Sequence, residues 1–79
     1  MEGVPLKYRK QVEARLRRLA GVIRDRREAL ELTQEGLAEG LEISIETMKA
    51  IESGRRVPSL AMLLYICLYL NIDFRFESP

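Results

Sequence analysis

Hydrophobic residues recur with a helical period through most of this chain. In residues 7 to about 32, the steps between apolar positions are mostly three or four residues, which places these positions on one face of a helix. The pattern predicts one long amphipathic helix with many basic residues on its other faces. Gly3 and Pro5 oppose helix formation, so residues 1–6 are expected to form a flexible N-terminus. The apolar positions of the long helix are Tyr8, Val12, Leu16, Leu19, Ile23 and Leu30.

Three shorter segments each follow a Ser or Thr whose side-chain oxygen can cap a helix N-terminus. The first two carry apolar residues on one side, and Gly54 is a natural stop after the second. The third is almost wholly apolar. The predicted helices are 34–41 after Thr33, 45–53 after Ser44 and 60–70 after Ser59.

The C-terminal segment, residues 71–79, alternates apolar and polar side chains, which is typical of a strand with one apolar face. No second strand candidate exists in the chain, so the expected partner is the same strand of a second copy, antiparallel about a two-fold axis. The alternative is a disordered tail. The dimer interface is expected to comprise Tyr65, Leu68, Tyr69, Ile72, Phe74 and Phe76.

These elements predict an all-α bundle of four main helices with a short C-terminal strand shared across a homodimer. The organisation is a flexible segment 1–6, a helical domain 7–70 and a dimerisation strand 71–79. At 79 residues the chain is a single small domain, and a second copy would add to a limited core.

The amino-acid composition excludes several kinds of functional site. Cys67 is the only cysteine and there is no histidine, so neither a disulfide nor a Cys/His metal site is expected. No nucleophile–base pair or phosphate-binding loop is visible, so we expect no enzyme and no cofactor. No apolar run is long enough for a membrane span and no signal peptide is evident, which makes a cytoplasmic protein the expectation.

Charge is unevenly distributed along a chain whose net charge is +1. Residues 1–31 carry nine Lys or Arg against five acidic residues, whereas residues 32–54 carry one Lys against five acidic residues. Residues 55–79 include Arg55 and Arg56. The basic residues either coat solvated helix faces or form a surface that contacts phosphates.

Two short helices separated by a turn that contains Glu42, after a long basic helix, have helix-turn-helix spacing. The stretch "LTQEGLAEGLEISIETMKAIESGRRVPS" resembles the helix-turn-helix of the phage repressor and Cro group, also called the XRE family. The resemblance covers about residues 15–72. The C-terminal strand is similar to the HipB-type antitoxin branch, whose strands pair across a dimer. The matching residues are Thr33-Gln34, Leu37-Ala38, Ile43-Ser44, Glu52, Gly54 and Pro58-Ser59.

The resemblance implies roles for individual residues. Arg27 and Glu52 are expected to form a structural ion pair, which would remove one carboxylate from the DNA side. The expected base contacts are Ile45, Glu46, Thr47, Lys49 and Ala50, which start or face outward from the third helix. The expected phosphate contacts are Gln34, Ser44, Arg55, Arg56 and Arg27, with Arg24 as the alternative to Arg27.

Two departures from the family bear on the second helix and its turn. Gly36 replaces a glutamate that would close a capping box with Thr33. Glu42 replaces a glycine in the turn, where a left-handed conformation costs a non-glycine residue about 1 kcal/mol. Gly40 offers another position for the turn.

The predicted function is sequence-specific binding of double-stranded DNA on a palindromic operator, as a homodimeric transcriptional regulator that represses genes and can regulate its own gene. One alternative is an antitoxin-type partner that neutralises a toxin protein. Another is a helix-turn-helix fold used only for protein contacts, which the acidic segment 32–54 favours.

Overall fold

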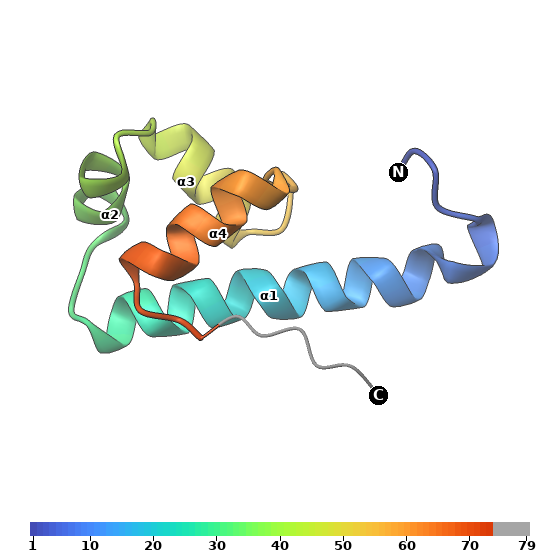
Figure 1. The fold of residues 1–79 in the computed structure, drawn as a ribbon, viewed down its shortest axis with the longest axis horizontal. Coiled ribbons are helices and arrows are strands. Elements are labelled where there is room, and N and C mark those ends of the chain that lie inside the picture. Colours follow the sequence, from blue (N-terminus) through green and yellow to red (C-terminus); the bar gives the residue numbers. More distant parts are fainter. Residues whose placement is uncertain (74–79) are drawn as a thin grey trace.

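A computed structural model describes residues 1–73, and within this range all regular secondary structure is helical (Figure 1). A 3-10 turn, η1 (Leu6–Tyr8), leads into the long helix α1 (Arg9–Ala29). Three short helices follow. They are α2 (Gln34–Leu41), α3 (Ile45–Glu52) and α4 (Leu60–Tyr69). The four main helices expected from the sequence are all present.

The helix boundaries differ in detail from the predictions. The long helix begins at Arg9 and ends at Ala29, so it is shorter than the predicted 7–32. α2 has its predicted bounds, and the turn after it lies at Glu42, so Gly40 does not relocate the turn. α3 and α4 each end one residue earlier than predicted.

Side-chain caps start the three short helices, as their sequences predict. The hydroxyls of Thr33, Ser44 and Ser59 accept hydrogen bonds from backbone N–H groups three residues ahead, at distances of 2.9, 3.1 and 3.1 Å. Each bond satisfies one of the N–H groups that a helix start leaves without a partner. Gly36 supplies its N–H to the Thr33 cap even though it cannot return a capping-box bond.

The same backbone motif ends α1, α2 and α4. Each helix is followed by a non-glycine residue with φ near +60° and then by an apolar residue that packs against the core. The N–H of that apolar residue donates to a carbonyl five residues back, as in a Schellman motif. These bonds join Leu32 to Arg27 (3.1 Å), Ile43 to Ala38 (3.0 Å) and Ile72 to Cys67 (2.8 Å), and the left-handed residues are Glu31, Glu42 and Asn71.

The core lies where the four helices meet. Five side chains that are at most 1% exposed come from α1, α2, α3, α4 and the end of α4, and each contributes about 1.5–3 kcal/mol through burial. α2 packs mainly on α3, and α3 packs on α1. The side chains are Ile23, Leu37, Met48, Ile66 and Leu70.

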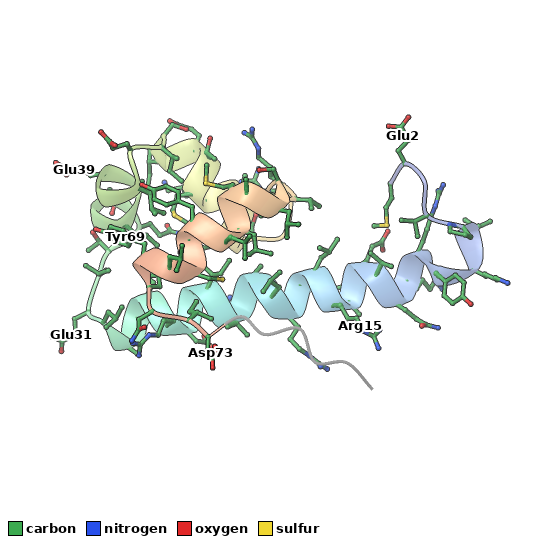
Figure 2. All side chains as sticks on the ribbon, viewed as in Figure 1. Glu2, Arg15, Glu31, Glu39, Tyr69 and Asp73 are labelled. Carbon is green, nitrogen blue, oxygen red and sulfur yellow. The ribbon has the colours of Figure 1, made fainter. Side chains whose placement is uncertain are left out.

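Tyr65 and Tyr69, which the sequence assigns to a dimer interface, make contacts within the chain. The Tyr65 hydroxyl donates a 3.0 Å hydrogen bond to the Leu41 carbonyl. Figure 2 shows Tyr69 between α4 and α2, where its ring lies against Gly40. Both rings remain more than a third exposed. The two tyrosines therefore tie α4 to α2, and their exposed edges still face solvent.

The predicted strand falls largely on residues that the structure does not describe, including Phe74 and Phe76. Within 71–73, Asn71 and Ile72 belong to the Schellman-type motif that follows α4, and Ile72 packs against the core. No strand is present in residues 1–73. Strand pairing and dimerisation through 74–79 thus stay predictions.

The first half of α1 extends past the bundle (Figure 1). The buried residues of α1 are Ala20, Ile23 and Arg27, and all three belong to the second half of the helix. There the Arg26 Nε donates a 2.8 Å hydrogen bond to the Leu70 carbonyl, at the end of α4. α1 is about 31 Å long at 1.5 Å per residue.

Candidate nucleic-acid interface

The second helix of the helix-turn-helix, α3, is anchored by its apolar side and exposes its polar side. Met48 and Ile51 are buried. At the start of the helix, the Ser44 hydroxyl accepts the Thr47 N–H and donates to the Thr47 Oγ1 at 2.8 Å. Glu46 and Lys49 are exposed. The helix therefore offers a rigid polar face of mixed charge.

Glu52, the last residue of α3, does not belong to that face. Its carboxylate is buried and accepts hydrogen bonds from the Arg27 Nε at 2.7 Å and from the Arg27 Nη2 at 3.0 Å. The Gln34 side-chain amide adds a bond of 3.2 Å. The ion pair implied by the resemblance is present, and it neutralises one of the two glutamates of α3 inside the fold.

Arg27, which is also an expected phosphate contact, is engaged within the fold. Arg27 is 9% exposed, and its remaining Nη1 donates to the Leu32 carbonyl at 2.8 Å. The hydrogen bond with Glu52 raises the pKa of the Arg27 guanidinium above its ordinary value, against the lowering effect of burial. Three of the five N–H groups of its guanidinium are engaged, so Arg27 holds α1, α3 and the α1–α2 connection together. A phosphate contact from Arg27 stays a prediction.

Gln34 lies at the start of α2 and is half-buried. Its amide nitrogen is joined to Glu52, so one of its two donor hydrogens is occupied. The sequence did not predict this interaction, because Gln34 and Glu52 come together only when α2 packs on α3. A phosphate contact from Gln34 stays a prediction that uses its second hydrogen.

The two arginines after α3 fold back beside it. The Arg55 Nε donates to the Ser53 Oγ at 2.9 Å, and Ser53 in turn donates to the Ala50 carbonyl at 3.1 Å. The Arg56 N–H bonds the same carbonyl at 3.1 Å, and its Nη1 lies 3.5 Å from the Thr47 Oγ1. Ser53 was not a predicted site residue, yet it positions Arg55.

The predicted base-contact residues differ in how much of each side chain is exposed to solvent. Glu46 and Lys49 are exposed, whereas Thr47 and Ala50 are half-exposed beside them. Ile45 is partly buried and packs against the core, so only part of its side chain can reach a ligand.

The exposed surface of α3 and the loop after it carries a net positive charge, although the sequence of α3 is acidic. With Glu52 neutralised by Arg27, the exposed charges of α3 and its C-terminal loop are Glu46 against Lys49, Arg55 and Arg56. The remaining acidic side chains of this motif are Glu35, Glu39 and Glu42, on α2 and its turn. Figure 2 shows Glu39 pointing outward from α2. The cations therefore gather at the α3 end of the motif and the anions at the α2 end.

Other kinds of site are not evident in the part of the chain that the structure describes. No helix among residues 1–73 is long and apolar enough to cross a membrane. No three potential metal ligands lie together within the same range. Cys67 is buried in the core, and burial raises the pKa of its thiol.

Comparison with protein families gives a match over residues 14–73 to a family described as Helix-turn-helix domain. Searches of curated proteins and of solved structures gave no match. The family match covers α2, the turn, α3 and α4, with most of α1. Such domains are typically not enzymes. The chain therefore belongs to this helix-turn-helix domain family, which indicates a DNA-binding regulator.

Proposed function

We propose that this protein is a transcriptional repressor that binds a palindromic DNA operator as a homodimer and uses α3 as its reading helix. The observation that carries the proposal is the ion pair of Arg27 with Glu52. It leaves the α3 surface with an excess of positive charge from Lys49, Arg55 and Arg56. A surface of this kind can approach a polyanion, whereas the acidic sequence of α3 alone would repel it.

Sequence selectivity is assigned to the two exposed charges of α3. The carboxylate of Glu46 can accept a hydrogen bond from a cytosine N4, and Lys49 can donate to a guanine O6 or N7. The methyl groups of Thr47 and Ala50 suit contact with a thymine methyl. Because a carboxylate near phosphates lowers affinity for every sequence, Glu46 favours discrimination over tight non-specific binding.

Dimerisation is supported by an exposed row of three leucines on α4, which we call the leucine line. Leu60, Leu64 and Leu68 are spaced four residues apart and are 61%, 39% and 82% exposed. α4 has no charged residue, so two copies can pack without burying an unpaired charge. A two-fold dimer would present two α3 helices to successive major grooves about 34 Å apart. The sequence prediction named only Leu68 of these three.

The experiment that tests the proposal is fluorescence anisotropy with DNA from upstream of the protein's own gene and with a shuffled fragment. We expect tight binding to the upstream fragment, a large gap over the shuffled one, and a steep loss of affinity with salt. Weak binding to both fragments at low salt would reject the proposal.

The oligomeric state is tested separately by light scattering after size exclusion. Leu68→Glu should give monomers, because it places charge on the leucine line without disturbing the core. Truncation after Asp73 tests the C-terminal strand and retains the Ile72 packing that ends α4. A Leu68→Glu variant that stays dimeric would reject the α4 interface.

A second candidate is an antitoxin-type or adaptor module whose leucine line binds another protein. The acidic residues of α2 and its turn, Glu35, Glu39 and Glu42, favour it because they weaken contact with DNA. A wild-type protein that is monomeric and shows no salt-dependent DNA binding would support this candidate and contradict the repressor.

A further inference from the structure

The overhanging half of α1 is strongly basic. Together with the last two residues of η1 it forms the stretch 7–18, which contains six Lys or Arg and a single acidic residue, Glu13. All six basic side chains are exposed, and within residues 1–73 none of them forms an ion pair with a carboxylate. A run of unpaired positive charge on a segment that packs against little else calls for an anionic partner.

Part of this charge lies on the same side of α1 as the end of α3. Positions seven apart differ by only about 20° around a helix, so Lys10, Arg17 and Arg24 share one face. A Cβ placed on Gly54 would lie 3.5 Å from the Cγ of Arg17. Arg17 therefore lies beside Gly54, one of the two residues between α3 and Arg55.

Arg17 and Arg55 also line the same groove. It has a volume of about 330 Å³ and lies between the overhanging half of α1 and the loop after α3. Arg17 contributes from the helix, and Arg55 contributes from the loop. The other lining residues are Met1, Glu13, Leu16, Ser53, Gly54 and Val57.

We propose that Lys10 and Arg17 extend the DNA interface beyond the helix-turn-helix, by binding phosphates that flank the site read by α3. This inference rests on the proposed function. A reading helix in the major groove has a phosphate backbone past its C-terminal end, which is where Arg55 and Arg17 lie. Lys10 is about 10 Å farther along α1, a distance of roughly three base pairs along the duplex.

Glu13 lies between these two cations and faces the same groove. Its carboxylate opposes phosphate binding, so the inference makes a prediction of opposite sign for this residue. Glu13→Gln should increase DNA affinity, while Lys10→Gln and Arg17→Gln should decrease it. A structural role for these exposed side chains would not produce such a pattern.

A charge-matched control is available on the other side of the same helix. Arg15 lies about 200° around the helix from Arg17. Figure 2 shows Arg15 pointing away from the side of α1 on which α3 and α4 pack. Arg18 lies about 100° from Arg17, and neither Arg15 nor Arg18 lines the groove. Arg15→Gln with Arg18→Gln removes the same number of positive charges as Lys10→Gln with Arg17→Gln.

The test measures binding of the upstream DNA fragment against salt for the full chain and its variants. Lys10→Gln/Arg17→Gln should reduce the slope of log K against log salt by about 0.9 for each phosphate that is no longer neutralised. Arg15→Gln/Arg18→Gln should leave the slope close to that of the wild type. Trimming about four base pairs from each end of the duplex should remove the difference between the wild type and Lys10→Gln/Arg17→Gln.

Different failures separate this inference from the proposed function. Equal slopes for the two double variants would overturn phosphate binding by α1 and would indicate an effect of net charge alone. An unchanged slope for Lys10→Gln/Arg17→Gln, with a reduced slope for Arg55→Gln/Arg56→Gln, would overturn phosphate binding by α1 and leave the repressor intact. Absence of salt-dependent binding by the wild type would overturn both.

Discussion

The guanidinium of Arg27 on α1 forms two hydrogen bonds with the carboxylate of Glu52 at the end of α3. The two residues are 25 positions apart in the sequence. This pair fixes α3 to α1 and takes one negative charge out of the proposed DNA-binding surface. This one ion pair thus contributes both to the stability and to the charge of the proposed interface.

Removing one partner of this pair should be far worse than removing both. We expect Arg27→Met to lower the free energy of unfolding by about 3–5 kcal/mol, because it leaves a buried carboxylate without its counter-ion. Arg27→Met combined with Glu52→Leu should recover much of that loss. Urea denaturation of the three proteins measures both effects, and a single variant within about 1 kcal/mol of the wild type would contradict the prediction.

Glycine at the end of α2 should stabilise the protein. Glu42 has φ 60°, and a side chain in this conformation costs about 1 kcal/mol. Its carboxylate also lies at the negative end of the α2 dipole. Glu42→Gly should raise the melting temperature, whereas Glu39→Gly, which removes the same charge from within α2, should lower it. A decrease for both variants would show that the left-handed residue carries no strain.

Gly21 and Gly40 are both helical, but alanine should have opposite effects at the two positions. A Cβ at Gly21 would lie 3.6 Å from the nearest atom, so Gly21→Ala should stabilise α1 by up to about 1 kcal/mol. A Cβ at Gly40 would overlap the Tyr69 hydroxyl and lie 2.7 Å from its Cζ. Gly40→Ala must displace the ring, so it should gain nothing or lose stability in thermal unfolding.

The effect of Gly40→Ala should also be measured in a Tyr69→Ala background, which lacks the ring that lies against Gly40. With the ring removed, Gly40→Ala should stabilise α2 by an amount similar to the effect at Gly21. If Gly40→Ala stabilises the wild type as much as Gly21→Ala does, the proximity of Tyr69 to Gly40 does not constrain the packing of α4 on α2.

Stability should fall in alkaline solution partly through Cys67. Burial raises the pKa of this thiol above its ordinary value of 9.0, so the folded protein keeps the proton that the unfolded chain loses. The unfolded state therefore binds fewer protons above pH 9.0, and the free energy of unfolding decreases as the pH rises. Cys67→Ala should show a smaller decrease between about pH 8 and 10, as measured by urea denaturation at each pH. Equal slopes would contradict the assignment.

Base selectivity should depend on Glu46. Glu46→Gln keeps the shape of the side chain but lets it donate as well as accept, so the preferred base at one operator position should change. Selection of binding sites from random DNA measures this. Glu39→Gln is the matched control, because it removes the same charge from α2 and should change affinity without changing preference. Unaltered preference in Glu46→Gln would exclude this residue as a base reader.

Local chemistry accounts for much of the fold. The caps at Thr33, Ser44 and Ser59 act within three residues of each helix start, so the sequence alone was enough to locate α2, α3 and α4. The long helix was also readable from its period. Its predicted end was wrong because Glu31, a residue that disfavours the left-handed region, nevertheless adopts it when Leu32 packs on the core.

The way in which these helices face one another could not be predicted. α4 is apolar almost throughout, so its pattern has no contrast, and packing alone left Leu60 and Leu68 exposed while it buried Leu63 and Ile66. The pattern of residues was enough to locate the helices, but not to predict which of their faces pack together.

The same division applies to the candidate interface. A family resemblance was enough to pair Arg27 with Glu52, but it did not reveal that Arg27 is buried and also bonded to the Leu32 carbonyl. The position of Arg17 beside the end of α3 was equally hidden in the sequence. Both facts depend on where α3 crosses α1, which is set by side-chain packing between residues far apart in the chain.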